Sequence, residues 1–481
     1  MMNTSVEEKL ISFKTLEQKI FDYVCELGRE ITRNVLENYD KELFVSRDTK
    51  QFRDKGRRKT SIKTVYGEVE YSRRVYRDNF ADGGKKVYVY LLDQAMQMDK
   101  IGLISTNLAE KIAMTVTESP YRVSADIISN TCGQRISAGG VWNMMQRLGE
   151  RISEEEEHAV KQMNADQAEG KKQIPVLFEE MDGVWLSMQD KDHKEMKKQE
   201  MKVATMYEGW DAEKEKQNRS TLVGKTMLAG MERSQEFHEK REACIRKKYD
   251  ADEIGQRILN GDGGSWIKEP YDPEAIFQLD RYHIYQEILR KIADKKAQQE
   301  IRELFEADKP DEMLEYIQTY ATSVESSDEK DNRSKKAMEL YKYLNNNKEG
   351  LLPYDKRGVK IPEPKEGIIY KEMGVQENQN CTAITMRMKH RRMRWSEKGA
   401  NNLAKALYRK ENRELIETID RYTDGLVFTL QMQEIIETLS AAKAPKKDGK
   451  GNPYADVINA HMPILDAIQT ASRKAFKKAF C

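Results

Sequence analysis

Cysteine is scarce in this chain, and no cysteine stands in a pattern that would bind metal or build a disulfide framework. The five cysteines are Cys25, Cys132, Cys244, Cys381 and Cys481. No two of them form a CxxC pair and their number is odd, so a zinc site or a disulfide scaffold is not expected. The six histidines are scattered, with no HExxH motif. A reducing cytoplasm is therefore the expected compartment.

Long apolar runs are also missing. No stretch of about eighteen apolar residues occurs, so we expect no membrane span. The first residues, MMNTSVEEKLISF, include acidic side chains and lack an apolar signal core, so we expect no secretion signal. With 34% charged residues in 481, the composition is typical of a soluble, mostly helical protein of two to four domains.

A strong excess of one charge is the third absence, since the formal net charge is only +1. Basic residues are nevertheless concentrated locally. From Arg53 to Arg77 there are nine Lys or Arg and three acidic residues, and MRMKHRRMR at 386–394 has five basic residues and no acid. The segment RKAFKK at 473–478 adds four more. Such runs suit phosphate contacts, and each also suits a solvated surface.

The first third of the sequence predicts helices around one basic hairpin. Apolar residues at helical spacing predict a helix over 5–40. Alternating residues at 61–66 and 68–76, separated by Gly67, predict a hairpin. Helices are expected at 124–130 and from a Ser137 cap to Leu148, with a turn at Gly133 between them. That spacing suits a helix-turn-helix, and 154–157 begins a helical connector.

Strand patterns follow from Ile174. VLFEEMDGVWLSMQ reads as two strands around Asp182–Gly183, and further strands are expected at MKVATMYEGW, STLVGKTMLAG, RILNGDGGSW and AIFQLDRYHIY. A polar helix is expected near 239–248. Asp182 and Asp262 would each follow an apolar strand and precede glycine. Carboxylates at strand ends can reach a ligand outside the core, and Mg²⁺ prefers carboxylate oxygens.

A third acid would complete a two-metal site, and Glu377 is the candidate. On a helix over 375–392 it would share a face with Cys381, Ile384 and Met388, and that face would pack on the sheet. Two cations about 3.5–4 Å apart can assist in-line displacement at phosphorus. Glu179, Glu180 and Asp280 are equally eligible by composition, and Asp-Gly is also a common turn dipeptide.

Several segments together resemble the DDE transposases of ISLre-type insertion sequences, which belong to the wider Mutator-like group. They are GEVEYSRRVYRD with LLDQAM after it, EEMDGVWLSM, NGDGGSWIK with QLDRYHIYQEI, and GVQENQNCTAITMRMKHRRMRWSEKGANNLAKAL. Their order and spacing match, and the likeness covers most of residues 60 to 410.

The resemblance implies an RNase H-like core and assigns its residues. Asp182, Asp262 and Glu377 match the family's catalytic acids, which bind Mg²⁺, with Mn²⁺ as a substitute. Asp280 and His283 match a D-x-x-H element. Trp395 begins a W-S-x-x-G-A signature.

The basic residues expected to contact DNA come from the hairpin and from the stretch after Glu377. They are Arg57, Arg58, Lys59, Arg73, Arg74, Arg387, Lys389, Arg391 and Arg392.

Local alternatives accompany these assignments. His283 also suits a helix start with local hydrogen bonds, and Trp395 and Trp266 also suit simple core packing. Glu372 and Glu397 lie near Glu377. The sequence departs from relatives that carry a cysteine pair after the hairpin, because YRDNFADGGKKVYVYL has none. A zinc-bound DNA-reading module is therefore not expected there.

The expected fold is a multidomain α/β protein with an RNase H-like mixed sheet. A mainly helical DNA-binding region would occupy 1–165, the first part of the core 166–285 and an all-helical insertion 286–365. The closing helix of the core would occupy 366–410. A helical tail would occupy 411–481, with a loop at 444–453 before its last helical part.

The expected function is Mg²⁺-dependent DNA cleavage and strand transfer of an insertion sequence. The partners would be element-end DNA and target DNA, with no membrane, and the protein would act as a homodimer or larger assembly. It would be cytoplasmic and associated with the nucleoid when bound to DNA. The alternatives are a metal nuclease that cuts without joining, and a non-catalytic DNA-binding protein on a transposase-derived fold.

Overall fold

The computed structural model describes residues 12–81, 86–97, 103–189, 197–268, 273–325 and 332–423. These residues divide into two compact units. One holds the described residues up to Thr60 together with Val69–Leu92. The other holds Ser61–Glu68 and the described residues from Asp93 onward. The predicted loop at 444–453, the basic segment 473–478 and the rest of the predicted tail beyond 423 lie outside the described residues.

The first unit combines a long helix with most of a three-stranded sheet. Helix α1 (Phe13–Ser46) begins at a Ser12 cap whose hydroxyl accepts from the Thr15 amide. The sheet has the order β1 (Phe52–Thr64), β2 (Gly67–Asp78) and β3 (Val87–Val89), and α2 (Leu91–Ala95) follows. The predicted helix and basic hairpin are confirmed, although β1 begins nine residues earlier than the alternation at Ser61 indicated.

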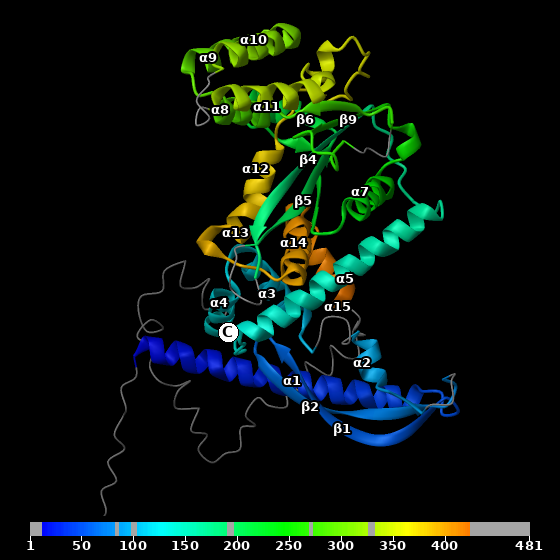
Figure 1. Cartoon of the computed structure of the whole chain (residues 1–481). Helices are drawn as coiled ribbons and strands as arrows, with labels where there is room; N and C mark the ends of the chain where they lie inside the picture. The colour runs from blue at the N-terminus through cyan, green and yellow to red at the C-terminus, as the bar shows by residue number, and fades with distance from the viewer. Residues whose placement is uncertain are drawn as a thin grey trace, which may run out of the picture. The chain divides into compact units, whose positions relative to one another are not determined.

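The second unit is built on a five-stranded mixed sheet (Figure 1). The strands are β4 (Val176–Ser187), β5 (Lys198–Tyr207), β8 (Thr226–Gly230), β9 (Gln256–Gly261) and β10 (Ile276–Leu279). Their order is β10-β9-β4-β5-β8. β4, β9 and β10 run parallel, while β5 is antiparallel to both β4 and β8. The predicted mixed α/β character is confirmed.

The prediction of two strands around Asp182–Gly183 is wrong. β4 runs unbroken through both residues, because its antiparallel partner β5 pairs with it from Phe178 to Ser187. Asp182 lies opposite Val203 and Gly183 opposite Lys202, so the Asp-Gly pair forms no turn.

Both faces of the sheet are covered, which explains the continuous apolar run of β4. Leu177 and Met181 belong to the large core shared with the flanking helices. Val176 and Phe178 point to the other face, where they pack in a smaller cluster with Trp210 and other residues. Phe178 stacks on Tyr207 with ring centroids 5.4 Å apart.

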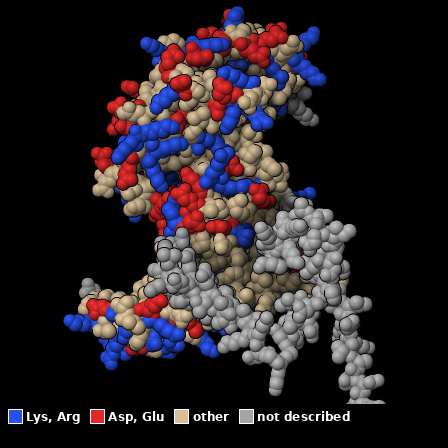
Figure 2. Space-filling model, turned by 180° about the vertical axis from the view of Figure 1, so that it is seen from behind, with Lys and Arg blue, Asp and Glu red and all other residues tan. Residues whose placement is uncertain are grey.

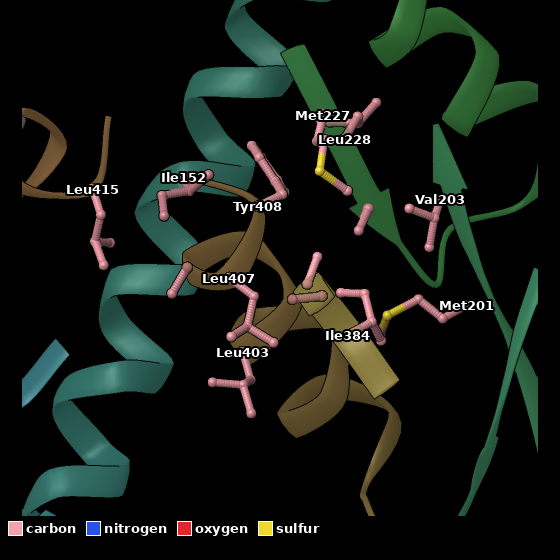
Figure 3. Close-up of a cluster of buried hydrophobic side chains, with 14 of the residues drawn as sticks. Ile152, Met201, Val203, Met227, Leu228, Ile384, Leu403, Leu407, Tyr408 and Leu415 are labelled. Atoms are coloured by element: carbon pink, nitrogen blue, oxygen red, sulfur yellow. The ribbon is translucent and has the colours of Figure 1, made fainter. Parts of the chain in front are cut away.

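Helices from before, between and after the strands share the large core. They are α3 (Thr106–Glu118), α4 (Tyr121–Thr131), α5 (Ala138–Asn164), α7 (Ser234–Lys248), α14 (Glu397–Glu411) and α15 (Leu415–Thr423). Figure 3 shows Leu403 and Leu407 of α14 between Ile152 of α5 and the strand residues Met201 and Met227.

The predicted Ser137 cap is confirmed, since its hydroxyl accepts from the Gly140 amide. The connector predicted at 154–157 is no separate element, because α5 continues through it.

Four helices form a layer with its own core (Figure 1). They are α8 (Arg281–Lys291), α9 (Lys295–Glu306), α10 (Pro310–Ser323) and α11 (Arg333–Asn346). Helices therefore occupy most of the described residues in 286–346, the first part of the insertion predicted at 286–365, whereas 347–365 holds only short 3-10 turns. The proposed domain boundaries stay predictions.

Short elements join these parts. They are β6 (Gly209–Asp211), α6 (Ala212–Lys216), β7 (Leu222–Val223), β11 (Ile368–Ile369) and the 3-10 turns Ala251–Glu253, Lys348–Gly350 and Tyr354–Lys356. Within the described part of the chain, no helix combines the length and apolar character needed to cross a bilayer.

Candidate functional site

Three aspartates occupy the same level of three neighbouring parallel strands. The pairing of β4 with β9 ends at Met181 and Gly261, one residue before Asp182 and Asp262. The pairing of β9 with β10 ends at Gly261 and Leu279, one residue before Asp262 and Asp280. Parallel strands lie about 4.8 Å apart, so this register gathers the three carboxylates at the carboxyl ends of the strands. The strand end that the sequence predicts for Asp262 is confirmed. Asp182 lies past the end of the pairing with β9, but β4 continues beyond it along β5.

Asp182 has three polar contacts. One carboxylate oxygen accepts from the Gly183 amide at 2.7 Å, and the other accepts from Asn380 Nδ2 at 2.7 Å. His283 Nε2 lies 3.6 Å from Asp182 Oδ1. Asp182 is 9% exposed. These contacts join β4, the start of α8 and the helix that carries Glu377.

The His283 imidazole stands among the acids. Burial alone would lower the pKa of His283. The hydrogen bond and charge of Asp182, with the charges of Asp280 and Asp262, outweigh burial and raise that pKa to about 9. A protonated imidazole therefore offsets part of the negative charge at neutral pH.

Asp280 has a clear structural task, which its register position did not reveal. It caps α8, because Oδ1 accepts from the amides of Tyr282 at 2.8 Å and His283 at 3.3 Å. Its other oxygen accepts from Asn260 Nδ2 at 2.7 Å. Asp280 thereby places His283 at the helix start, where its backbone amide bonds locally while its imidazole contacts the distant Asp182.

Asp262 lies just past β9, where its carboxylate accepts from the Gly264 amide at 2.8 Å. A further acid, Glu200 of β5, is close to it. Burial raises the pKa of Glu200, and the charges of Asp262 and Asp182 raise it further. Gly183 gives Glu200 room, since a Cβ at 183 would overlap its carboxylate. No sequence signal separated Glu200 from the many other acids.

Glu377 lies in the first turn of α12 (Gln376–Asn380) and is exposed. Its carboxyl is partly covered by neighbouring atoms. This partial burial raises the pKa of Glu377, and the charge of Asp182 raises it further. The two acids are therefore within electrostatic reach.

The predicted shared face is wrong in one respect. Cys381 is exposed, whereas Ile384 and Met388 are buried. A π-helical turn at Cys381–Thr385 shifts the register before α13 (Met386–Met388).

Glu180 attaches the Glu377 segment to the sheet. This fully buried carboxylate accepts from the amides of Gly374 at 3.1 Å and Gln376 at 3.2 Å. It also accepts from Tyr207 Oη at 2.5 Å and Asn260 Nδ2 at 3.0 Å. Glu180 lies on the same face of β4 as Asp182, two residues earlier. Its role is therefore to position the loop before α12.

Replacing Glu180 with alanine should destabilise the protein by about 1–3 kcal/mol, because several buried donors would lose their acceptor. Chemical denaturation measures this change. Glu366→Ala removes an exposed carboxylate from the same stretch of chain and should change stability by less than about 0.5 kcal/mol. Equal stability of the two variants would refute the attachment role.

The charge of Glu179 is offset by two arginines. It lies on the opposite face of β4, within 2.7 Å of Arg257 Nε and 3.4 Å of Arg241 Nε. Burial raises the pKa of Glu179, but the charges of Arg257 and Arg241 hold it below its usual value. Glu372 pairs with Arg281 at 2.7 Å, and Glu397 begins α14. None of the three shares the contacts of Asp182.

The donor types at the strand ends suit a hard divalent cation, because all are carboxylates. Among the described residues, however, no three His, Cys, Asp or Glu side chains form a set ready to hold a metal ion. Asp182 and Asp280 face internal donors instead. Holding a cation there would require at least one of these acids to change its position.

Basic side chains of the hairpin fall into two groups. Arg57, Arg58 and Lys59 of β1 are exposed, and Figure 2 shows Lys and Arg gathered over this region. Arg73 lies over the Tyr90 ring at 3.9 Å, and Arg74 pairs with Asp54 at 3.1 Å. The first group is therefore available to a partner, and the second stabilises the first unit.

The residues after Glu377 also divide. Arg387 is 5% exposed and donates to the Val116 carbonyl at 2.6 Å, so its side chain is not at the surface where the predicted DNA contact would require it. Lys389 and Arg392 are exposed, and the side chain of Arg391 lies outside the described structure. Trp395 is buried and donates to the Met388 carbonyl at 2.9 Å, as core packing requires. Trp266 packs edge-on against Phe237.

A family model described as "Uncharacterised protein family (UPF0236)" matches residues 6–419. The chain belongs to the UPF0236 family. Among curated proteins, "UPF0236 protein in vanSb 3'region" of Streptococcus gallolyticus is 23% identical to the UPF0236 chain over 396 residues, covering 81% of this chain and 80% of that protein.

One solved structure, the "Drosophila P element transposase strand transfer complex", is 10% identical to the UPF0236 chain. The match covers 72% of the UPF0236 chain and 87% of the chain in that structure, with a TM-score of 0.19. A likeness this slight supports no argument about the fold or activity of the UPF0236 chain.

Proposed function

We propose that this protein is a DDE-type transposase that cuts and joins DNA at the ends of an insertion sequence. The observation that carries the proposal is the register of Asp182, Asp262 and Asp280 at one level of three parallel strands. Glu377 lies within electrostatic reach of Asp182. Acids gathered in this way provide a site where a cation and a phosphate can meet.

The strand order supports an RNase H-like core. Three antiparallel strands, β8, β5 and β4, are followed across the sheet by two strands parallel to β4. The ISLre-like motifs lead to the same core, since they place the first two acids on β4 and after β9. The helical layer α8–α11 then stands between the second acid and Glu377, where the motifs predict an insertion.

Asp182, Asp262 and Glu377 would hold Mg²⁺, or Mn²⁺ in its place. When bound, the metal supplies activation of the attacking oxygen and stabilisation of the leaving oxygen. The chain's own groups position these acids. Asn380 orients Asp182, Asp280 places His283 at the start of α8, and Glu180 holds the segment before Glu377. The proposal involves no covalent protein–DNA intermediate.

DNA contact is assigned to the exposed hairpin residues Arg57, Arg58 and Lys59. Replacing all three with alanine should weaken duplex binding at all sequences alike. The slope of log K against log salt should become shallower by up to about three, because each phosphate contact contributes about 0.9. Fluorescence anisotropy between low and moderate salt measures both effects.

The matched control is the double variant Lys295→Ala, Lys296→Ala, which removes exposed charge from α9. Its salt slope should stay near that of the unmodified protein. A triple hairpin variant with an unchanged slope would show that phosphate contacts lie elsewhere.

A non-catalytic DNA-binding protein is the second candidate. It is favoured by the absence, in the described part of the chain, of three acids already set to hold a metal. A metal nuclease that cuts without joining would use the same acids.

One assay separates the three functions. The full chain is incubated with Mg²⁺, labelled DNA that includes the sequences flanking its reading frame, and a target plasmid. A transposase yields joined products, a nuclease only cut ends, and a DNA-binding protein only a mobility shift. Joined products are the expected result, and a shift without cutting at any divalent cation would overturn the proposal.

A further inference from the structure

A hollow of about 320 Å³ opens in the second unit, away from the aspartates. Its wall comes from the start of α4, the first turns of α5, the end of β4 and the segment that joins α13 to α14. The lining residues are Pro120, Tyr121, Trp142, Gln189, Arg387, Met393, Arg394, Trp395, Ser396 and Gly399. None of these is acidic, and two are arginines. The hollow therefore suits a ligand that is flat or anionic.

The Tyr121 hydroxyl in this wall has unused hydrogen-bonding capacity. Its oxygen is buried and has no hydrogen-bond partner among the described residues. Burial raises the pKa of Tyr121 to about 12, so the phenol keeps its proton. A buried polar group without a partner costs free energy, and such groups often mark a place where a ligand supplies the missing bond.

Two further side chains provide complementary contacts. Trp142 belongs to α5 and is 43% exposed, so part of its ring is open to a ligand. Arg394 is also exposed. Gln189 donates from its backbone amide to the Trp395 carbonyl at 2.8 Å and from Nε2 to the Arg394 carbonyl at 3.3 Å.

These groups match the parts of a nucleotide. Aromatic rings such as Trp142 stack on any base, and an amide or hydroxyl bonds to a base edge. An exposed arginine such as Arg394 binds phosphate. Trp395 and Arg387 form the firm side of the hollow, because each donates to a backbone carbonyl of the protein itself.

Strand β4 connects the acids to the wall of the hollow. Met188, just past β4, pairs with Trp395, and Met188 is six residues along the chain from Asp182. At 3.3 Å per residue the separation along the strand is about 20 Å.

We propose that this hollow receives an unpaired base of the bound DNA, with Trp142 stacking on the base and Tyr121 bonding to its edge. The inference rests on the proposed function, since it assigns a second contact to the same DNA. It predicts that the protein extrudes, or selects, an unpaired base at one fixed position of the end sequence.

The test uses the full chain and duplexes with a single mismatch moved one position at a time along the end sequence. Mismatched bases leave the helix at least cost, so the protein should bind best when the mismatch meets the hollow. Trp142→Ala should abolish that preference and weaken binding of a short single-stranded oligonucleotide by about 5- to 150-fold. Tyr121→Phe, which removes only the hydroxyl, should reduce the preference about fivefold.

Ile416→Ala is the control, because it shortens an exposed apolar side chain on α15. Its mismatch preference should equal that of the unmodified protein, and both test variants should bind fully paired duplex as the unmodified protein does. Binding and cutting of paired duplex without any mismatch preference would overturn the base pocket and leave the transposase proposal standing. Failure to bind any DNA would overturn both.

Discussion

An Asp182→Asn protein should join DNA ends at least about a thousandfold more slowly than the unmodified protein. Asparagine keeps the size of the side chain but removes the charge that we propose holds a divalent cation. A thousandfold change corresponds to about 4 kcal/mol of transition-state stabilisation, a loss expected when a metal-holding carboxylate is neutralised. Time courses of joined product measure the rates, and gel mobility measures end binding, which should stay within about twofold.

The control for this substitution is Asp252→Asn. Asp252 has a highly exposed side chain (84%) in the same unit and pairs with Arg246 at the surface. It should join ends at the normal rate. An Asp182→Asn protein that matches this control would show that the carboxylate has no part in the chemistry.

A Lys405→Met protein should lose about 3–5 kcal/mol of its free energy of unfolding. Lys405 is fully buried on α14, with Nζ 2.7 Å from Glu232 Oε1 and 2.9 Å from Glu156 Oε2. Lys240 pairs with the same two carboxylates at 2.6 and 3.0 Å. Removing one cation leaves two buried carboxylates with a single cationic partner, Lys240, which is the costly way to break a buried ion pair.

The pH dependence of stability provides a second test of this prediction. Burial alone would raise the pKa of Glu232, but Lys405 and Lys240 lower it to about 2 from an ordinary value of 4.5. The stability that this shift contributes is complete above about pH 4.5 and is lost as pH falls toward 2. With Lys405 gone the shift is smaller, so the difference in stability between the two proteins should narrow as pH falls below about 4.5.

Lys398→Met tests whether any lysine on this helix would have the same effect. Lys398 is exposed on α14 and pairs with Glu150 at the surface, where such pairs contribute about 0–1 kcal/mol. A Lys405→Met protein no less stable than this control would refute the role assigned to the buried network.

The candidate aspartates could be found from sequence because their signal is local. Asp262 follows a short apolar run that becomes a strand, and its neighbour Gly261 ends the pairing with β10. The sequence indicates Asp280 only as an eligible acid and through the D-x-x-H resemblance. The Ser137 cap was visible for the same reason. Such features depend on a few adjacent residues and on the chemistry of the backbone.

The errors arose where distant segments decide the local structure. Asp182–Gly183 resembles a turn, but pairing with β5 keeps the strand extended past it. The π-helical turn at Cys381–Thr385 rotates the helix face that follows Glu377, and no residue in CTAIT predicts such a turn. The attachment of the loop at Gly374 to Glu180 joins residues 194 positions apart.

Burial likewise could not be read from charge. Arg387 and Arg392 belong to one basic run, yet the first is buried against the Val116 carbonyl and the second is exposed. A run of basic residues predicts exposed side chains. The prediction fails for a residue such as Arg387, whose side chain finds a backbone carbonyl near the end of a neighbouring helix.

Binding of Mn²⁺ to the protein on element-end DNA, followed by paramagnetic resonance, tests most directly whether the strand-end acids hold cations. We expect saturable binding in the unmodified protein and its loss in Asp182→Asn and in Asp262→Asn, while Glu372→Gln binds normally. Equal Mn²⁺ binding in all four proteins would contradict a metal site at the ends of β4 and β9.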